Sequence, residues 1–187
     1  MRDENLSYNK RQLKERPTIR QIAEQFLNDE LRAQLEVFLQ YIEGAKMPLS
    51  LNRCNTYQSN YKGKPMFRIE IANGQACQRD IYAVKVYAAN DGAHFRDETK
   101  TNMEDAFTAY TSQLDDDMKD YFLSHFYRCR GCGKCRPGAK MSLFDKEYTA
   151  LCACNVLVLR VDNPSADDYE MIKRLIAARK DYILQTK

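Results

Sequence analysis

The spacing of apolar residues changes from a helical period to a strand period along the chain, and this change restricts the possible folds most. Within residues 29–44 the apolar side chains recur three or four positions apart, at Leu31, Leu35, Phe38, Leu39 and Ile42. That spacing is typical of one buried face of an α-helix. From residue 49 onward, apolar and polar residues alternate, as at Phe67, Ile69 and Ile71. Alternation predicts strands with one buried face.

Local capping signals predict where further helices begin. Thr18 followed by Gln21 matches a capping box, so a helix is expected directly after Pro17. It would pair with the helix of residues 29–44. Further helix starts are predicted at residues 101–104, 115–117 and 163–165.

The strand signals come in a run rather than alternating with helices. Residues 57–61, 67–71 and 82–86 predict a three-stranded antiparallel meander, and the apolar residues 156–161 predict one more strand near the C-terminus. The expected fold is therefore α+β. Its antiparallel sheet is packed by an N-terminal helical pair, by the middle helices and by the C-terminal helix, and it carries a Cys-rich hairpin.

The domain organisation follows from the same patterns. Residues 1–16 are polar without an apolar period and are predicted to form a flexible tail or a frayed helix. Residues 17–187 are predicted to form a single α+β domain that includes the Cys-rich segment 128–154. This element order resembles that of small, uncharacterised bacterial α+β families with a Cys-rich hairpin. The resemblance covers most of the chain in outline and implies no activity.

Five of the seven cysteines are clustered, at Cys129, Cys132, Cys135, Cys152 and Cys154. An odd, clustered set is a poor disulfide framework and is more typical of metal binding or redox chemistry in a reducing compartment. The two groups flank a predicted hairpin of residues 141–144 and 147–151, so four thiolates can surround Zn²⁺. The sequence therefore predicts a structural zinc site, and it leaves open which of the five cysteines is not a ligand.

Two alternatives remain for the same segment. The spacing of Cys129, Cys132 and Cys135 is similar to the first three ligands of a bacterial ferredoxin motif, which favours an iron–sulfur or thiol redox protein. The segment is also basic, which is compatible with a nucleic-acid-binding regulator that contacts phosphate through Arg128, Arg130, Lys134, Arg136 and Lys140. Neutralisation of the thiolates explains these cations with fewer assumptions, and a net charge of +3 alone argues for neither nucleic acid nor membrane.

The remaining sequence signals concern location and activity. No apolar run approaches the roughly 20 residues of a membrane helix, and the N-terminus lacks a signal-peptide pattern, so a soluble, cytoplasmic protein is expected. No common catalytic motif occurs, so a binding or scaffold protein is predicted, and a small ligand between meander and helices stays open. Cys54 and Cys77 are expected to pack as small hydrophobes. His94 and His125 have no partnered motif.

Overall fold

The computed structural model describes residues 2–88, 107–126, 139–143, 146–151 and 158–185. The chain divides into two compact units, and each is described by itself. The first unit is Met1–Lys85 with Val161–Glu170, and the second is Val86–Arg160 with Met171–Lys187. The single domain expected over residues 17–187 stays a prediction.

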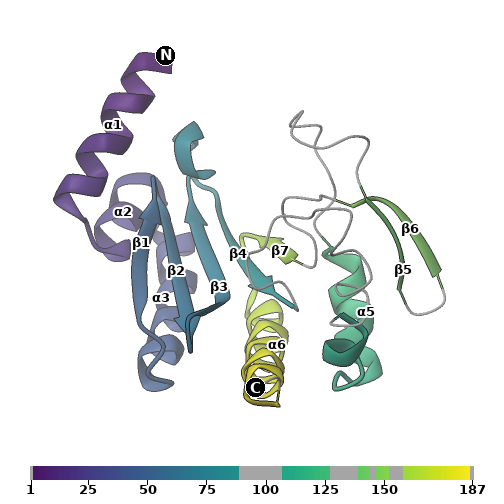
Figure 1. The fold of residues 1–187 in the computed structure, drawn as a ribbon. Coiled ribbons are helices and arrows are strands. Elements are labelled where there is room, and N and C mark those ends of the chain that lie inside the picture. Colours follow the sequence, from purple (N-terminus) through teal and green to yellow (C-terminus); the bar gives the residue numbers. More distant parts are fainter. Residues whose placement is uncertain (1, 89–106, 127–138, 144–145, 152–157, 186–187) are drawn as a thin grey trace. The chain divides into compact units, whose positions relative to one another are not determined.

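Five strands form one antiparallel sheet in the order β1-β2-β3-β4-β7 (Figure 1). The strands are β1 (Leu49–Arg53), β2 (Thr56–Tyr61), β3 (Lys64–Ile71), β4 (Tyr82–Tyr87) and β7 (Val158–Asp162). The predicted α+β class is confirmed, with one strand more than the meander and C-terminal strand expected. The additional strand is β1, which is first in the strand order and has a register shift between Leu51 and Arg53.

Helices begin where the sequence places capping side chains. The helices are α1 (Arg2–Glu15), α2 (Ile19–Phe26), α3 (Asp29–Gly44), α5 (Asp116–Ser124) and α6 (Ala166–Gln185), and residues 107–111 are also helical. At α2, the Thr18 hydroxyl accepts a hydrogen bond from the Gln21 backbone N–H at 3.3 Å, while Gln21 Oε1 accepts from the Thr18 N–H at 2.8 Å. The capping box is therefore confirmed. In the first unit, α2 and α3 cover one face of β1, β2 and β3 (Figure 1).

The N-terminal segment is helical, the second of its two predicted states. In place of a flexible tail over residues 1–16, the structure has the helix α1. Gln12 of this helix is buried, its Nε2 donates to Asn55 Oδ1 at 2.6 Å, and its Oε1 accepts from the Asn55 backbone N–H at 2.7 Å. Because α1 is attached by polar bonds to the turn between β1 and β2, it needs no apolar period.

The core of the first unit is built around aromatic rings. Phe38 of α3 is fully buried, and its ring stacks on Tyr169 with centroids 4.9 Å apart and tilts against Phe67 at 5.8 Å. The Tyr169 hydroxyl lies 2.5 Å from the hydroxyl of Tyr82. A buried hydroxyl is stable only with a partner, so this pair joins β4 to the start of α6.

The second unit has its own aromatic cluster. Phe107 packs against Phe122 and Phe126 with ring centroids 5.6 and 6.3 Å apart, and Tyr110 packs edge-on against Tyr182 at 5.9 Å. The helical face predicted to begin after residues 101–104 is thus buried. Residues 101–104 themselves lie outside the described part of the chain.

A separate two-stranded sheet pairs β5 (Ala139–Leu143) with β6 (Lys146–Leu151). Leu143 lies opposite Lys146, and Ala139 lies opposite Leu151. The strands are close to those predicted at residues 141–144 and 147–151. The five clustered cysteines lie outside the described residues, so the Cys-rich metal site stays a prediction. No helix in the described ranges is both long enough and apolar enough to cross a bilayer.

Candidate functional site

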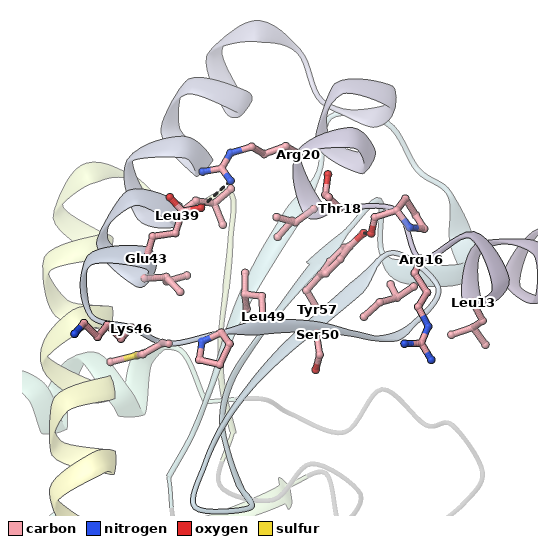
Figure 2. Close-up of a pocket in the computed structure, with 16 residues that line it drawn as sticks. Leu13, Arg16, Thr18, Arg20, Leu39, Glu43, Lys46, Leu49, Ser50 and Tyr57 are labelled. Atoms are coloured by element: carbon pink, nitrogen blue, oxygen red, sulfur yellow. Dashed lines mark hydrogen bonds and ion pairs between the residues drawn. The ribbon is translucent and has the colours of Figure 1, made fainter.

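A cavity of about 920 Å³ lies in the first unit, beside α2, α3 and the edge strand β1 (Figure 2). Its volume is typical of sites that take a small molecule. Most of its lining side chains are apolar or aromatic: Leu13, Pro17, Ile19, Leu39, Ile42, Met47, Pro48, Leu49, Leu51 and Tyr57.

The periods of the flanking elements place these side chains on the cavity wall. Leu39 and Ile42 are three positions apart in α3 and therefore share one face of the helix. Leu49 and Leu51 are two positions apart in β1 and therefore share one face of the strand. The two leucines of β1 are only half-buried. Apolar surface in this part of the unit thus faces a hollow instead of closing against a neighbour.

Some polar side chains of the lining are already bonded within the protein, and others are available to bind a ligand. Arg20 donates two hydrogen bonds to the Glu36 carboxylate, both at 2.9 Å, and one to Glu43 at 2.7 Å. These bonds raise the pKa of Arg20, and the bond from Arg20 lowers the pKa of Glu36. Three of the five N–H donors of Arg20 are therefore already bonded to carboxylates of the protein.

Arg16 and Lys46 are the other cations of the lining. Arg16 follows α1 and Lys46 follows α3, and Figure 2 shows them toward opposite ends of the cavity. Both are exposed, and neither forms an ion pair within the part of the chain that the structure describes. The lining carries three cations and one carboxylate, and Glu43 is already bonded to Arg20. Arg16 and Lys46 are therefore the two cations of the lining that are available to a ligand.

Tyr57 places an aromatic ring on the cavity wall. Its hydroxyl donates to the Pro17 carbonyl oxygen at 2.7 Å, and burial raises its pKa above the ordinary value. The hydroxyl is thus held protonated and already bonded. Among the residues that the structure describes, the lining has no cysteine or histidine and one carboxylate, that of Glu43. This arrangement is suited to holding a molecule, since it presents apolar surface and positive charge but no activated nucleophile.

The two cysteines outside the cluster lie in this unit, away from the cavity lining. Cys54 is buried and packs as predicted, whereas Cys77 is only half-buried. The Sγ atom of Cys77 accepts a hydrogen bond from Asn55 Nδ2 at 4.0 Å, and the Cys54 thiol donates to the Gly74 carbonyl oxygen at 4.0 Å. Burial raises the pKa of Cys54 to about 11 and also raises the pKa of Cys77. Both are therefore thiols at neutral pH.

The other residues considered in the sequence have local roles or lie outside the described ranges. Asp115 caps α5 by accepting from the Met118 N–H at 3.0 Å, and His125 Nδ1 lies 3.0 Å from the Tyr121 carbonyl at the end of that helix. Within the described residues, no three His, Cys, Asp or Glu side chains are arranged to hold a metal. Cys129, Cys132, Cys135, Cys152 and Cys154, like His94, are not among them.

The residues of the cavity were not singled out by their sequence pattern. The available signal was the apolar pair of Leu49 and Leu51 before the meander, together with cations at the ends of two predicted helices. Comparison with protein-family models, with curated proteins and with solved structures finds no match, so the function has to be inferred from the chemistry of this chain's own residues.

Proposed function

We propose that this protein binds an amphipathic small molecule, with an apolar body and a carboxylate, in the cavity of the first unit. The observation that carries the proposal is an apolar hollow of about 920 Å³ with Arg16 and Lys46 unpaired among the described residues at its rim. Apolar lining with a few orienting polar groups is the usual composition of a small-molecule site.

The expected affinity comes chiefly from the apolar body. At roughly 25 cal/mol per Å² of apolar surface, a ligand that buries about 200 Å² gains about 5 kcal/mol. Exposed ion pairs contribute little by comparison. Arg16 or Lys46 would therefore orient the carboxylate, while Leu13, Leu49 and Leu51, whose side chains are not fully buried, would supply most of the binding free energy.

Calorimetric titration with straight-chain carboxylic acids of increasing length tests this proposal. The affinity is expected to rise with chain length, because each added CH₂ buries more apolar surface. The Leu51→Glu variant should bind these acids at least tenfold more weakly, because its new carboxylate repels the carboxylate of the ligand and makes the apolar wall polar. Val37→Glu is the matched control, since Val37 is an exposed apolar residue of α3 outside the lining.

The carboxylate is tested separately from the apolar body. Alcohols of matched length should bind more weakly than the acids. The Arg16→Ala variant should reduce this difference in affinity between acid and alcohol. The Arg79→Ala variant should leave it unchanged, because Arg79 lies outside the cavity lining. Binding that is independent of chain length, or equal in the Leu51→Glu and Val37→Glu variants, would contradict the proposal.

We also propose that the Cys-rich segment binds a structural zinc ion. The pairing of β5 and β6 favours it: Ala139 lies opposite Leu151, the residue that precedes Cys152, and Cys135 is four positions before Ala139. Both cysteine groups are thus joined in sequence to the same end of one hairpin. Four thiolates from two such groups are the usual ligands of a closed zinc site.

Elemental analysis and a visible spectrum of protein purified anaerobically without chelator test the zinc proposal. About one zinc per chain and no colour are expected for a Cys₄ site, and chelation should lower the melting temperature. Iron with sulfide and a visible band would favour the iron–sulfur alternative instead. A metal-free protein with strongly salt-dependent nucleic-acid binding, lost on replacing Arg130, Lys134 and Arg136, would favour the regulator.

A further inference from the structure

Two loops of the first unit bring the thiols of Cys54 and Cys77 together. Cys54 lies in the turn between β1 and β2, and Cys77 directly follows the short helix η1 (Gly74–Ala76) between β3 and β4. Cys54 Sγ lies 4.0 Å from the Gly74 carbonyl oxygen, and the same oxygen accepts from the Cys77 backbone N–H at 3.4 Å. Both cysteines are free thiols in the structure.

Hydrogen bonds fix the positions of the two loops that carry Cys54 and Cys77. The Gly74 carbonyl oxygen accepts from Asn55 Nδ2 at 3.1 Å and from the Cys54 thiol at 4.0 Å. Gly74 has a φ of +61°, a left-handed backbone conformation that favours glycine. On the other side, Gln78 N–H donates to the Ala72 carbonyl at 3.0 Å and closes the loop that carries Cys77.

We infer that Cys54 and Cys77 are a redox-modification site, a dithiol that a low-molecular-weight disulfide such as oxidised glutathione converts into an intramolecular disulfide. Both sulfur atoms lie beside one hydrogen bond on anchored loops, because Asn55 Nδ2 donates to the Gly74 carbonyl oxygen, Cys54 Sγ lies 4.0 Å from that oxygen, and Cys77 Sγ lies 4.0 Å from that nitrogen. Their reaction with each other is therefore intramolecular and pre-organised, which favours it over reaction with a second thiol from solution.

The two cysteines take different parts in the exchange. Burial raises the pKa of the Cys77 thiol and the hydrogen bond from Asn55 partly offsets that rise, while Cys77 is the more exposed of the two cysteines. After losing its proton, Cys77 attacks one sulfur of the small disulfide, which forms a mixed disulfide and releases one thiolate. Cys54 then loses its proton and attacks Cys77 Sγ, which releases the second thiolate. The protein loses two electrons and two protons, and the small disulfide is reduced to two thiols.

Peptide mapping of the full chain after incubation with oxidised glutathione tests this inference. Trypsin releases Cys54 in residues 54–62 and Cys77 in residues 69–79, and neither peptide contains another cysteine. The expected product is these two peptides joined, at a mass two hydrogen atoms below their sum, and separated again by dithiothreitol. Free thiols are blocked before digestion to prevent later exchange.

Two variants separate the roles and keep the inference open to contradiction. Cys54→Ser should accumulate glutathione on Cys77, because the resolving thiol is missing, and Cys77→Ser should leave Cys54 unmodified under the same conditions. Circular dichroism before and after oxidation checks that the fold is intact. The inference is overturned if folded protein gives no joined peptides, if Cys77 pairs instead with a cysteine of residues 129–154, or if Cys54 is modified first.

Discussion

Replacing Glu70 with alanine is expected to lower the free energy of unfolding by about 3–5 kcal/mol. Lys85 Nζ lies 2.9 Å from Glu70 Oε1, and the two side chains are only 5% and 8% exposed. Removing the carboxylate takes away the opposite charge that the buried Lys85 ammonium contacts between β3 and β4. A buried charge that loses its partner costs far more than an exposed one. Urea denaturation followed by circular dichroism measures the change.

The matched control is the second partner of the same carboxylate. Arg53 also contacts Glu70 Oε1, at 3.1 Å, but its side chain is 54% exposed. Arg53→Ala should therefore change stability by about 1 kcal/mol or less. The double variant Glu70→Leu with Lys85→Met should be clearly more stable than Glu70→Ala, because it removes both charges. A double variant as unstable as Glu70→Ala would show that the ion pair is not the source of the loss.

Replacing Phe38 with alanine is expected to cost a similar amount, about 3–5 kcal/mol. The ring is fully buried and contacts the rings of Tyr169, Phe67 and Tyr41 at centroid distances of 4.9, 5.8 and 6.1 Å. Its removal leaves a cavity at the centre of the first unit, and packed rings can fill it only partly. Guanidinium denaturation, read by far-ultraviolet circular dichroism, is the measurement.

The neighbouring residue supplies the control for this prediction. Val37 precedes Phe38 in α3 but is largely exposed. Val37→Ala should change the free energy of unfolding by about 0.5 kcal/mol or less. If Phe38→Ala were no more destabilising than Val37→Ala, the aromatic cluster would not be the core of this unit.

Features that depend on near neighbours in sequence could be predicted from it. Thr18, Asn28 and Asp115 each accept a hydrogen bond from a backbone N–H three residues later. Such a cap is encoded within one helical turn. The buried helical face that includes Leu35, Phe38 and Ile42 follows in the same way from a regular period.

Features that depend on residues far apart in sequence could not be predicted. Helix α1 docks through Gln12 and Asn55, whose polar side chains looked like surface residues. Alternation placed Lys85 on an exposed face of the meander, yet every residue of β4 is buried, and Lys85 is paired with Glu70. A one-dimensional pattern records which positions are apolar, but it does not record which distant polar groups meet.

The cavity could not be predicted from the sequence for a related reason. Its wall joins Leu13 of α1, Leu39 of α3 and Leu51 of β1, which lie far apart in the chain. Each of them belongs to a pattern that would equally suit a closed core. Whether such surfaces meet or leave a hollow depends on the lengths and directions of the connections between elements, and the hydrophobic period carries no information about these.

The edge position of β1 has a consequence for self-association. An unpaired strand edge is a template on which strands of other molecules can assemble into an extended sheet. β1 has only five residues, follows Pro48, and loses its regular register between Leu51 and Arg53. Few of its backbone N–H and C=O groups are therefore positioned to pair with a strand of another molecule. The cationic Lys46 and Arg53, near the two ends of β1, also repel a second copy of the chain. This edge can keep Leu49 and Leu51 accessible to a ligand without becoming a nucleus for fibril growth.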